Sequence, residues 1–128
     1  MKTLKGVLVN TKDNTIKECT LEYNDFLPSI YGLLDCDTID IVARRFGNQT
    51  YSIVCDDEGL FKEKVIPAVI TFHDGQVVEQ LVGNVFICSQ DDEGELASLT
   101  HEQVEEICRV QAEFYDEKTL RTCLVAHL

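Results

Sequence analysis

Apolar and polar residues alternate in short stretches over most of the chain, and a period of two is typical of half-buried β-strands. The first two stretches are Leu4–Asn10 and Thr15–Tyr23. Between them lies Thr11–Asn14, which carries the Asp and Asn residues that are common in turns. The pattern therefore predicts an N-terminal hairpin.

Further strands are predicted from the same alternation or from short, fully apolar runs. They are Thr38–Phe46, Gln49–Cys55, Val65–Phe72, Val77–Leu81 and Val85–Ser89. The pairs Gly47–Asn48 and Asp74–Gly75 have the composition of tight turns between neighbouring strands. Pro67 has no amide hydrogen to donate, so its strand is expected to lie at a sheet edge or to start near the proline.

Two segments have the longer period of amphipathic helices. Phe26–Leu34 has a broad apolar face, and Asn24 or Asp25 precedes it as a candidate N-cap. Thr100 and Gln103 have the spacing of a capping box, and an apolar stripe follows them as far as Tyr115.

The last apolar stretch is ambiguous. Leu120–Leu128 fits either a second C-terminal helix or a final strand, and we favour the helix.

The elements together predict an α+β fold, in which an antiparallel sheet of about six strands carries one early helix and one or two C-terminal helices. The length of 128 residues fits a single α+β domain, with a helical segment at about residues 98–128.

Cysteine usage and hydropathy indicate the compartment. Six cysteines lie 15 to 33 residues apart, mostly within apolar runs. Disulfide frameworks belong mainly to short secreted chains, so we expect reduced thiols. No apolar run reaches the roughly 18 residues of a membrane span, and the start lacks a signal-peptide pattern. We therefore expect a cytoplasmic protein without a membrane partner.

The formal net charge is −12, and it is unevenly distributed. Residues 1–55 carry 6 basic and 7 acidic side chains, whereas residues 56–128 carry 5 basic and 16 acidic ones. A field of this sign repels nucleic-acid backbones, so direct nucleic-acid binding is not expected. The charge serves either solubility or docking onto a basic groove of a partner protein.

The sequence motifs of catalytic and metal sites are absent. There is no Cys-x-x-Cys, no His-x-x-x-His and no glycine-rich phosphate loop. His101 and Glu105 are spaced as a surface pair on a helix. No serine or cysteine has the context of an activated nucleophile. We expect no cofactor, no metal and no enzymatic activity; the alternative is a Cys–His site assembled in space.

The candidate ligand-binding residues are the arginines and the polar or aromatic residues of nearby strands. Arginine binds phosphate through paired hydrogen bonds, and aromatic rings stack on bases. The candidates are Arg44, Arg45, Tyr51, Asn84, Phe86, Arg109 and Arg121. The competing interpretation is that Arg109 pairs with glutamates of its own helix and that Tyr51 and Phe86 belong to the core.

Several motifs resemble an uncharacterised family of small domains that is common in phages and mobile elements of Firmicutes. They are Leu34–Val42 (LDCDTIDIV), Asp57–Leu60, Gly83–Ile87 and Ser98–Glu105. The resemblance covers about residues 4–108. It implies a phage counter-defence protein, similar to the sponges of the Thoeris anti-defence kind. Such a protein binds and sequesters a cyclic nucleotide immune signal in the host cytoplasm without cleaving it.

Two further hypotheses concern partners. The acidic charge of residues 56–128 favours an inhibitor of a bacterial nuclease, of anti-CRISPR or anti-restriction type, as the alternative function. The apolar C-terminus predicts a homo-oligomer through residues of about 100–128, because an apolar surface patch usually marks an interface. If this stretch instead folds onto its own sheet, a monomer is expected.

Overall fold

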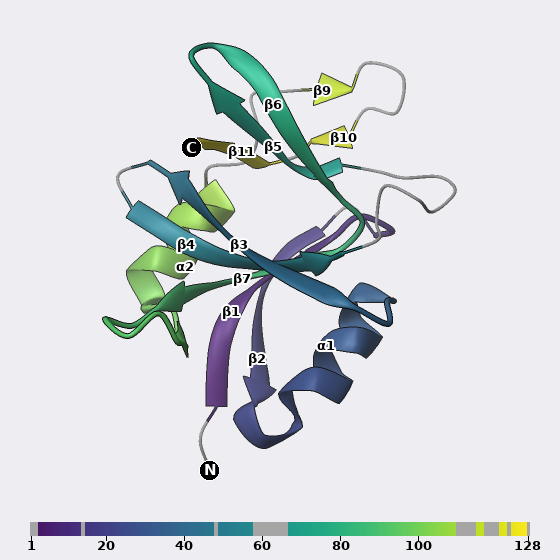
Figure 1. Ribbon diagram of the computed structural model, residues 1–128, viewed down its shortest axis with the longest axis vertical. Helices are drawn as coiled ribbons and strands as arrows, with labels where there is room; N and C mark the ends of the chain where they lie inside the picture. The colour runs from purple at the N-terminus through teal and green to yellow at the C-terminus, as the bar shows by residue number, and fades with distance from the viewer. Residues whose placement is uncertain are drawn as a thin grey trace.

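A mixed β-sheet forms the body of the molecule, and a helix packs against each of its faces (Figure 1). The computed structural model describes residues 3–13, 15–47, 49–57, 67–109, 115–116, 121–122 and 124–127. The strands of the main sheet are β1 (Thr3–Asn10), β2 (Thr15–Glu22), β3 (Ile39–Phe46), β4 (Gln49–Asp56), β5 (Pro67–His73), β6 (Gln76–Val82), β7 (Val85–Gln90), β8 (Leu96–Ala97) and β11 (Leu124–His127). The other elements are the 3₁₀ helix η1 (Tyr23–Asp25), the α-helices α1 (Phe26–Leu34) and α2 (His101–Arg109), and the strands β9 (Tyr115–Asp116) and β10 (Arg121–Thr122).

The long strands follow the order β2-β1-β7-β4-β3-β11-β5-β6, and the short β8 pairs with β7. The neighbours in the main sheet are antiparallel except β11 and β5, which run parallel. Strands β9 and β10 form a separate two-stranded sheet. The β5–β6 hairpin is thus attached to the body through β11, and β2 and β6 are the two edges of the sheet.

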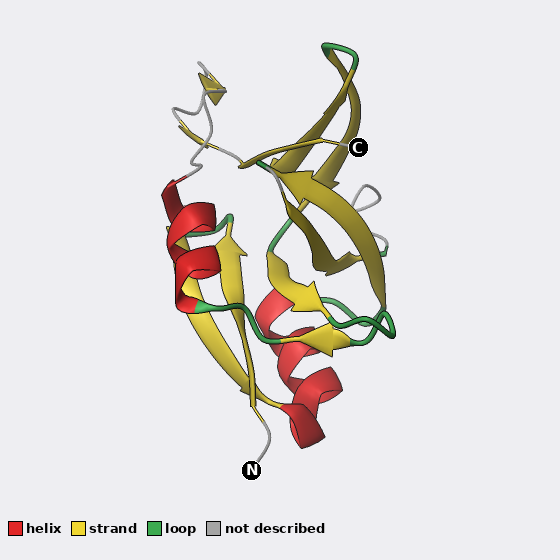
Figure 2. Ribbon diagram, turned by 90° about the vertical axis from the view of Figure 1, so that its left-hand side faces the viewer, coloured by secondary structure: helices red, strands yellow, loops and turns green. Residues whose placement is uncertain are grey.

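The central strands β1, β7 and β4 are buried on both faces because successive side chains point to opposite sides of a sheet. One hydrophobic cluster, packed with α2 and the β5–β6 hairpin, includes Val7, Tyr51 and Ile87. The other, packed with α1, includes Leu4 and Phe86. Figure 2 shows the two helices apart from one another, with strands between them. Each helix therefore covers its own face of the sheet.

A glycine allows the closest approach at the centre. A Cβ atom on Gly6 of β1 would collide with the main-chain oxygen of Ile87 and with the ring of Phe86, both on β7. Phe86 itself is fully buried. The missing side chain of Gly6 therefore makes room for the aromatic ring that fills the α1 face.

The predicted β5–β6 hairpin is confirmed. Asp74 and Gly75 form its two-residue turn with φ angles of 51° and 78°. Positive φ at both central positions is what the turn of a two-residue hairpin requires, and Asp-Gly tolerates it well. Pro67 is the first residue of β5, where its missing amide hydrogen removes no interior ladder bond.

Both predicted helix starts are found, but they are capped differently. The main-chain amide of Thr100 donates to Gln103 Oε1 at 2.8 Å, and the amide of Gln103 donates to Thr100 Oγ1 at 3.2 Å, which confirms the capping box. Asp25 occupies the N-cap position of α1 but accepts no side-chain cap hydrogen bond. The predicted capping of α1 by Asp25 is therefore wrong, since η1 leads directly into the helix.

The preferred helix at Leu120–Leu128 is also wrong, because the described residues of this stretch form β10 and β11. Leu124 and Ala126 are fully buried on one face of the sheet, and Val125 packs on the other. A strand that is buried on both faces reads as a continuous apolar run, which periodicity cannot distinguish from a helix. Insertion between β3 and β5 gives β11 main-chain partners on both sides.

Two other fold predictions need correction. The described residues form a main sheet of nine strands instead of about six, and α2 is described over His101–Arg109, with Tyr115 lying in β9. From Tyr115 onward the described residues of the predicted helical segment at about residues 98–128 form strands, and residues 110–114 of the predicted stripe lie outside the described residues. The burial of Leu124 and Ala126 also removes part of the apolar surface behind the predicted homo-oligomer, which stays a prediction.

The described residues agree with the expectations on thiols. Five cysteines are described, and none of them takes part in a disulfide: Cys19, Cys36, Cys55, Cys88 and Cys108; Cys123 lies outside the described residues. None of the described helices has the length and apolar character needed to cross a membrane. The cytoplasmic location stays a prediction.

Candidate functional site: an acidic cleft

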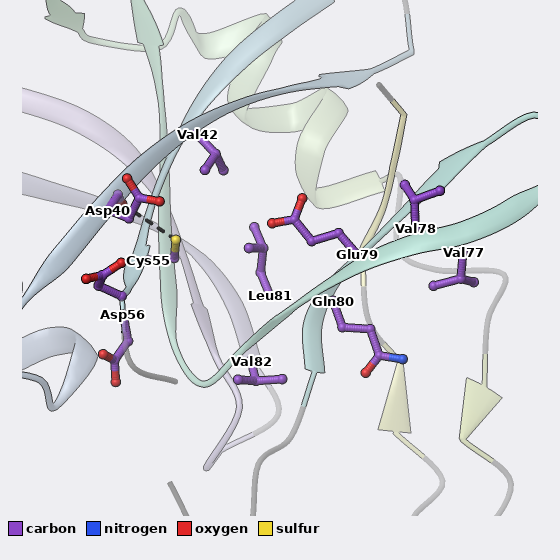
Figure 3. A pocket seen from close by; sticks show the side chains of 11 residues that line it. Asp40, Val42, Cys55, Asp56, Val77, Val78, Glu79, Gln80, Leu81 and Val82 are labelled. Atoms are coloured by element: carbon purple, nitrogen blue, oxygen red, sulfur yellow. Dashed lines mark hydrogen bonds between the residues drawn. The ribbon is translucent and has the colours of Figure 1, made fainter. Parts of the chain in front are cut away.

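A cleft of about 530 Å³ lies between the β5–β6 hairpin and the paired strands β3 and β4 (Figure 3). Its described lining residues are Asp40, Val42, Cys55, Asp56, Asp57 and the run Val77–Val82. Strand β6 is separated from β3 by β11 and β5 in the sheet. The sheet must therefore curve for β6 to face β3 and β4 across the cleft.

An ion pair joins the two walls of the cleft. Arg44 Nη2 of β3 donates to Glu79 Oε2 of β6, and these side chains are 15% and 33% exposed. Arg44 Nη1 also donates to the main-chain oxygen of Ala43 at 2.7 Å. The pair is partly desolvated, so it is worth more than a fully exposed pair. It holds the hairpin against β3.

Two buried polar atoms near this pair lack a hydrogen-bond partner. They are Arg44 Nε and the hydroxyl oxygen of Thr71. Thr71 is fully buried on β5 and pairs in register with Glu79. Unsatisfied buried groups are rare in folded proteins and call for an explanation such as a bound water or a strained site. The polar interior beside the cleft is thus not fully satisfied by the described residues.

The cleft is acidic. Four of its described lining residues are carboxylates, Asp40, Asp56, Asp57 and Glu79, and the described lining contains no lysine, arginine or histidine. Arg44, which lies beside this lining, pairs with Glu79. Four valines, Leu81, Cys55 and Gln80 supply the remaining described walls, and Val77 and Val78 are 45% and 50% exposed. The cleft therefore combines negative charge with an accessible apolar surface, which suits a ligand that is both cationic and apolar.

The thiol of Cys55 points into this cleft and donates to the main-chain oxygen of Asp40 at 3.5 Å (Figure 3). Burial raises the pKa of Cys55 from 9.0 to about 12, and the negative charges of Asp40 and Glu79 add to the rise. Only the thiolate is a strong nucleophile, so this residue stays protonated and unreactive at neutral pH. The geometry does not favour a cysteine nucleophile here.

The described residues also contain no group of three or more His, Cys, Asp or Glu side chains able to hold a metal ion. His101 Nε2 lies 3.0 Å from Glu105 Oε1 on the exposed side of α2, which confirms the predicted surface pair. His73 lies beside Asp74 in the exposed β5–β6 turn. The cleft carboxylates are therefore distributed along its walls and do not converge.

The candidate arginines are not brought together in the described structure. Arg44 is engaged with Glu79, and Arg45 is exposed on the opposite face of β3. Arg109 ends α2, where its Nε donates to the main-chain oxygen of Glu105 at 3.3 Å. The competing interpretation was a pair with a glutamate carboxylate of the same helix; the bond that the structure shows goes to a main-chain oxygen instead. Arg121 lies in β10, and its side chain is outside the described residues.

The aromatic and amide candidates belong to the framework. Tyr51 and Phe86 are fully buried in the two opposite clusters, so neither ring face is available for stacking on a base. Asn84 is buried and accepts from the amide of Thr11 at 2.8 Å, while its amide group donates to the oxygen of Leu33 at 2.9 Å. Asn84 thus ties the β6–β7 turn to the first hairpin and to the end of α1.

The residues that shape the cleft were missed by sequence reasoning. Asp56 and Asp57 belong to an acidic turn after an apolar strand, which gives a local signal of charge and no signal of function. Asp40 and Glu79 are single acids on amphipathic strands, where a charged residue usually faces solvent. Their proximity depends on the curvature of the sheet, which no local pattern encodes.

The strands that line this site all lie within the region that matches a known family. The match covers residues 3–114, and the family is described as a domain of unknown function, DUF3846. The chain belongs to this family. The expected membership in an uncharacterised domain family is confirmed, while the phage origin and the counter-defence role stay predictions. Comparison with curated proteins and with solved structures gave no match.

Proposed function

We propose that this protein of the DUF3846 family is a non-catalytic binding protein that docks onto a basic, partly apolar segment of a partner protein through the acidic cleft. The observation that carries the proposal is the described lining of the cleft, with four carboxylates, exposed valines and no basic side chain. An acidic inhibitor of a nuclease is one function of this kind, because such enzymes bind nucleic acid through basic grooves.

Three further observations support this proposal. The formal net charge of −12 would steer a basic partner toward the protein and raise the association rate. The protonated Cys55 offers no nucleophile in the cleft. The candidate arginines are spread over β3, the end of α2 and β10, and this arrangement does not favour the alternative of a phosphate-binding pocket.

Binding of a basic probe peptide tests the proposal. The probe is a seven-residue peptide of alternating lysine and valine, and calorimetry at two salt concentrations measures its affinity. We expect binding that weakens as salt rises, because exposed charges are screened. The triple variant Asp40→Asn, Asp56→Asn, Asp57→Asn should bind at least about tenfold more weakly, since a tenfold change corresponds to roughly 1.4 kcal/mol in total.

The control removes the same charge elsewhere. The variant Glu22→Gln, Asp92→Asn, Glu93→Gln neutralises three acids that are exposed and do not line the cleft. It should keep most of the affinity. If both triple variants lose the same amount, the peptide is attracted by net charge alone and the cleft is not the binding site.

The nucleotide-sequestering role is tested separately. Calorimetry with a panel of cyclic nucleotides and cyclic ADP-ribose isomers should give no heat if the acidic cleft is the functional site, because phosphates would be repelled. Tight binding of any of these ligands would instead favour the sponge hypothesis and contradict our proposal.

A further inference from the structure

Strand β6 is an edge of the main sheet, with β5 as its hydrogen-bonded neighbour among the described strands. Edge strands present unpaired main-chain groups, and proteins usually protect them with charged side chains, especially lysine. The opposite edge, β2, follows this rule with the exposed Lys17 and Glu18, and Glu18 pairs with Lys5 at 3.5 Å. The β2 edge is therefore protected by charged side chains.

Strand β6 lacks this protection. Its sequence is Gln-Val-Val-Glu-Gln-Leu-Val, and Val77 and Val78 are about half exposed. Its one charged side chain, Glu79, is turned inward to Arg44 instead of outward along the edge. An accessible edge without lysine is a template for the addition of another strand.

The same strand forms one wall of the acidic cleft. Figure 3 shows Glu79 and Leu81 directed toward the wall that carries Val42, Asp40 and Cys55, whereas Gln80 points away. Side chains of a strand added beside β6 would alternate in the same way, because neighbouring strands share the pleat of the sheet. Every second residue of such a strand would thus face the carboxylates of β3 and β4.

We infer that the basic partner segment binds as an extended strand along the free edge of β6. This inference rests on the proposed function and specifies its binding mode. The segment carries lysine or arginine at every second position, facing Asp40, Asp56 and Asp57. Small aliphatic residues alternate with these, and the exposed Val77 and Val78 provide apolar surface at the turn end of β6. Main-chain hydrogen bonds to β6 supply affinity, and the alternating pockets supply specificity.

Charge argues against a second copy of the chain as the occupant. Pairing of two β6 strands would bring the acidic clefts of two chains together, each chain with a net charge of −12. Like charges placed opposite one another destabilise a strand pair. A basic segment removes this repulsion.

Two N-methylated forms of the lysine–valine peptide distinguish strand addition from charge attraction. One form carries methyl groups on the lysine amides and the other on the valine amides, so each blocks one edge of the peptide strand and leaves its charge unchanged. We expect one form to bind about tenfold more weakly than the other, since it loses two or three main-chain hydrogen bonds. We also expect slowed amide exchange at alternate residues of the accessible part of β6, residues 76–80, when the unmodified peptide is bound.

Three outcomes of these experiments would overturn the inference of strand addition. Equal affinity of the two methylated forms, together with unchanged amide exchange in β6, overturns strand addition while the proposed function stands. Absence of binding by the unmodified peptide overturns both. Protection of the β2 amides in place of those of β6 would show that the peptide binds at the opposite edge of the sheet, and this would also overturn the inference.

Discussion

The centre of the sheet and its β5–β6 side differ in how they use their residues. Strands β1, β7 and β4 bury apolar side chains on both faces, under two separate helices. Strand β5 is buried on both faces at Ala68–Thr71, whereas β6 is exposed at Gln76–Val78, and this hairpin carries an ion pair, an unsatisfied hydroxyl and a half-exposed valine pair. The proposed function accounts for this difference, because a centre buried on both faces supplies stability while a binding surface must stay accessible.

The largest effect is expected at the centre, from Gly6→Ala. The new Cβ would meet the main-chain oxygen of Ile87 and the ring of Phe86, and the main-chain oxygen cannot move without displacing β7. We expect a loss of about 3 kcal/mol or more in the free energy of unfolding, measured by urea denaturation. Gly32→Ala is the matched control, since its Cβ would have open space within α1, and it should be neutral or stabilising. Equal losses would contradict the tight approach of β1 to β7.

The elements that the sequence predicts correctly differ from those that it does not in how far apart their residues lie along the chain. The first hairpin, α1, β3, β4 and the Asp74–Gly75 turn are formed by residues close in sequence, and their local patterns suffice. Strand β11 comes from the far end of the chain and inserts between β3 and β5. Its apolar run has no period that distinguishes a strand from a helix. Its position depends on the main-chain groups of β3 and β5, which are brought together only in the folded sheet.

The site is harder to predict than the fold for a related reason. Sequence reasoning selected arginines and aromatic residues by residue type, and Tyr51 and Phe86 proved to be core residues. The cleft instead depends on acids such as Asp40 and Glu79, which are 39 positions apart and line the same cleft because the sheet curves. Each acid alone looks like an ordinary surface residue, so its role appears only when the strands are in place.

A smaller effect is expected from Arg44→Gln, which tests the attachment of the β5–β6 hairpin. The change removes the charged partner of Glu79 and leaves a partly buried carboxylate without its ion pair. We expect a loss of about 1–3 kcal/mol and faster amide exchange in β5 and β6 than in β1 and β7. Arg45→Gln on the exposed face of the same strand should stay within about 0.5 kcal/mol. If both variants behave alike, the ion pair does not hold the hairpin.

Thr100→Ala is expected to cost about 1 kcal/mol, because the amide of Gln103 loses its acceptor at the start of α2. Thr100→Ser keeps the hydroxyl oxygen and should restore most of this stability. Thermal or urea unfolding of the three proteins measures the difference. A serine variant as unstable as the alanine variant would show that the methyl group of Thr100 matters more than the capping hydrogen bond. The cap would then add little to the stability of the centre of the sheet.

The smallest effect at neutral pH is expected from Cys55→Ser, at the border between the centre and the cleft. Burial and the nearby carboxylates raise the pKa of Cys55 from 9.0 to about 12 in the folded protein. The unfolded chain therefore releases the thiol proton at lower pH than the folded one. The resulting stabilisation is complete below pH 9 and is lost as pH rises through the folded pKa. Burial likewise raises the pKa of Cys88 to about 12, so this thiol contributes to the same loss.

Serine keeps a donor for the Asp40 oxygen but does not titrate in this range, so Cys55→Ser should lose stability less steeply than the wild type between pH 9 and pH 12. Urea midpoints at a series of alkaline pH values, with Cys88→Ser as the matched variant inside the α1 cluster, measure both contributions. The Cys55 and Cys88 variants should flatten the alkaline slope to a similar extent, because both thiols are deeply buried. A slope unchanged by Cys55→Ser would mean that water reaches this thiol through the cleft. Cys55 would then belong to the solvent-accessible cleft and not to the buried centre of the sheet.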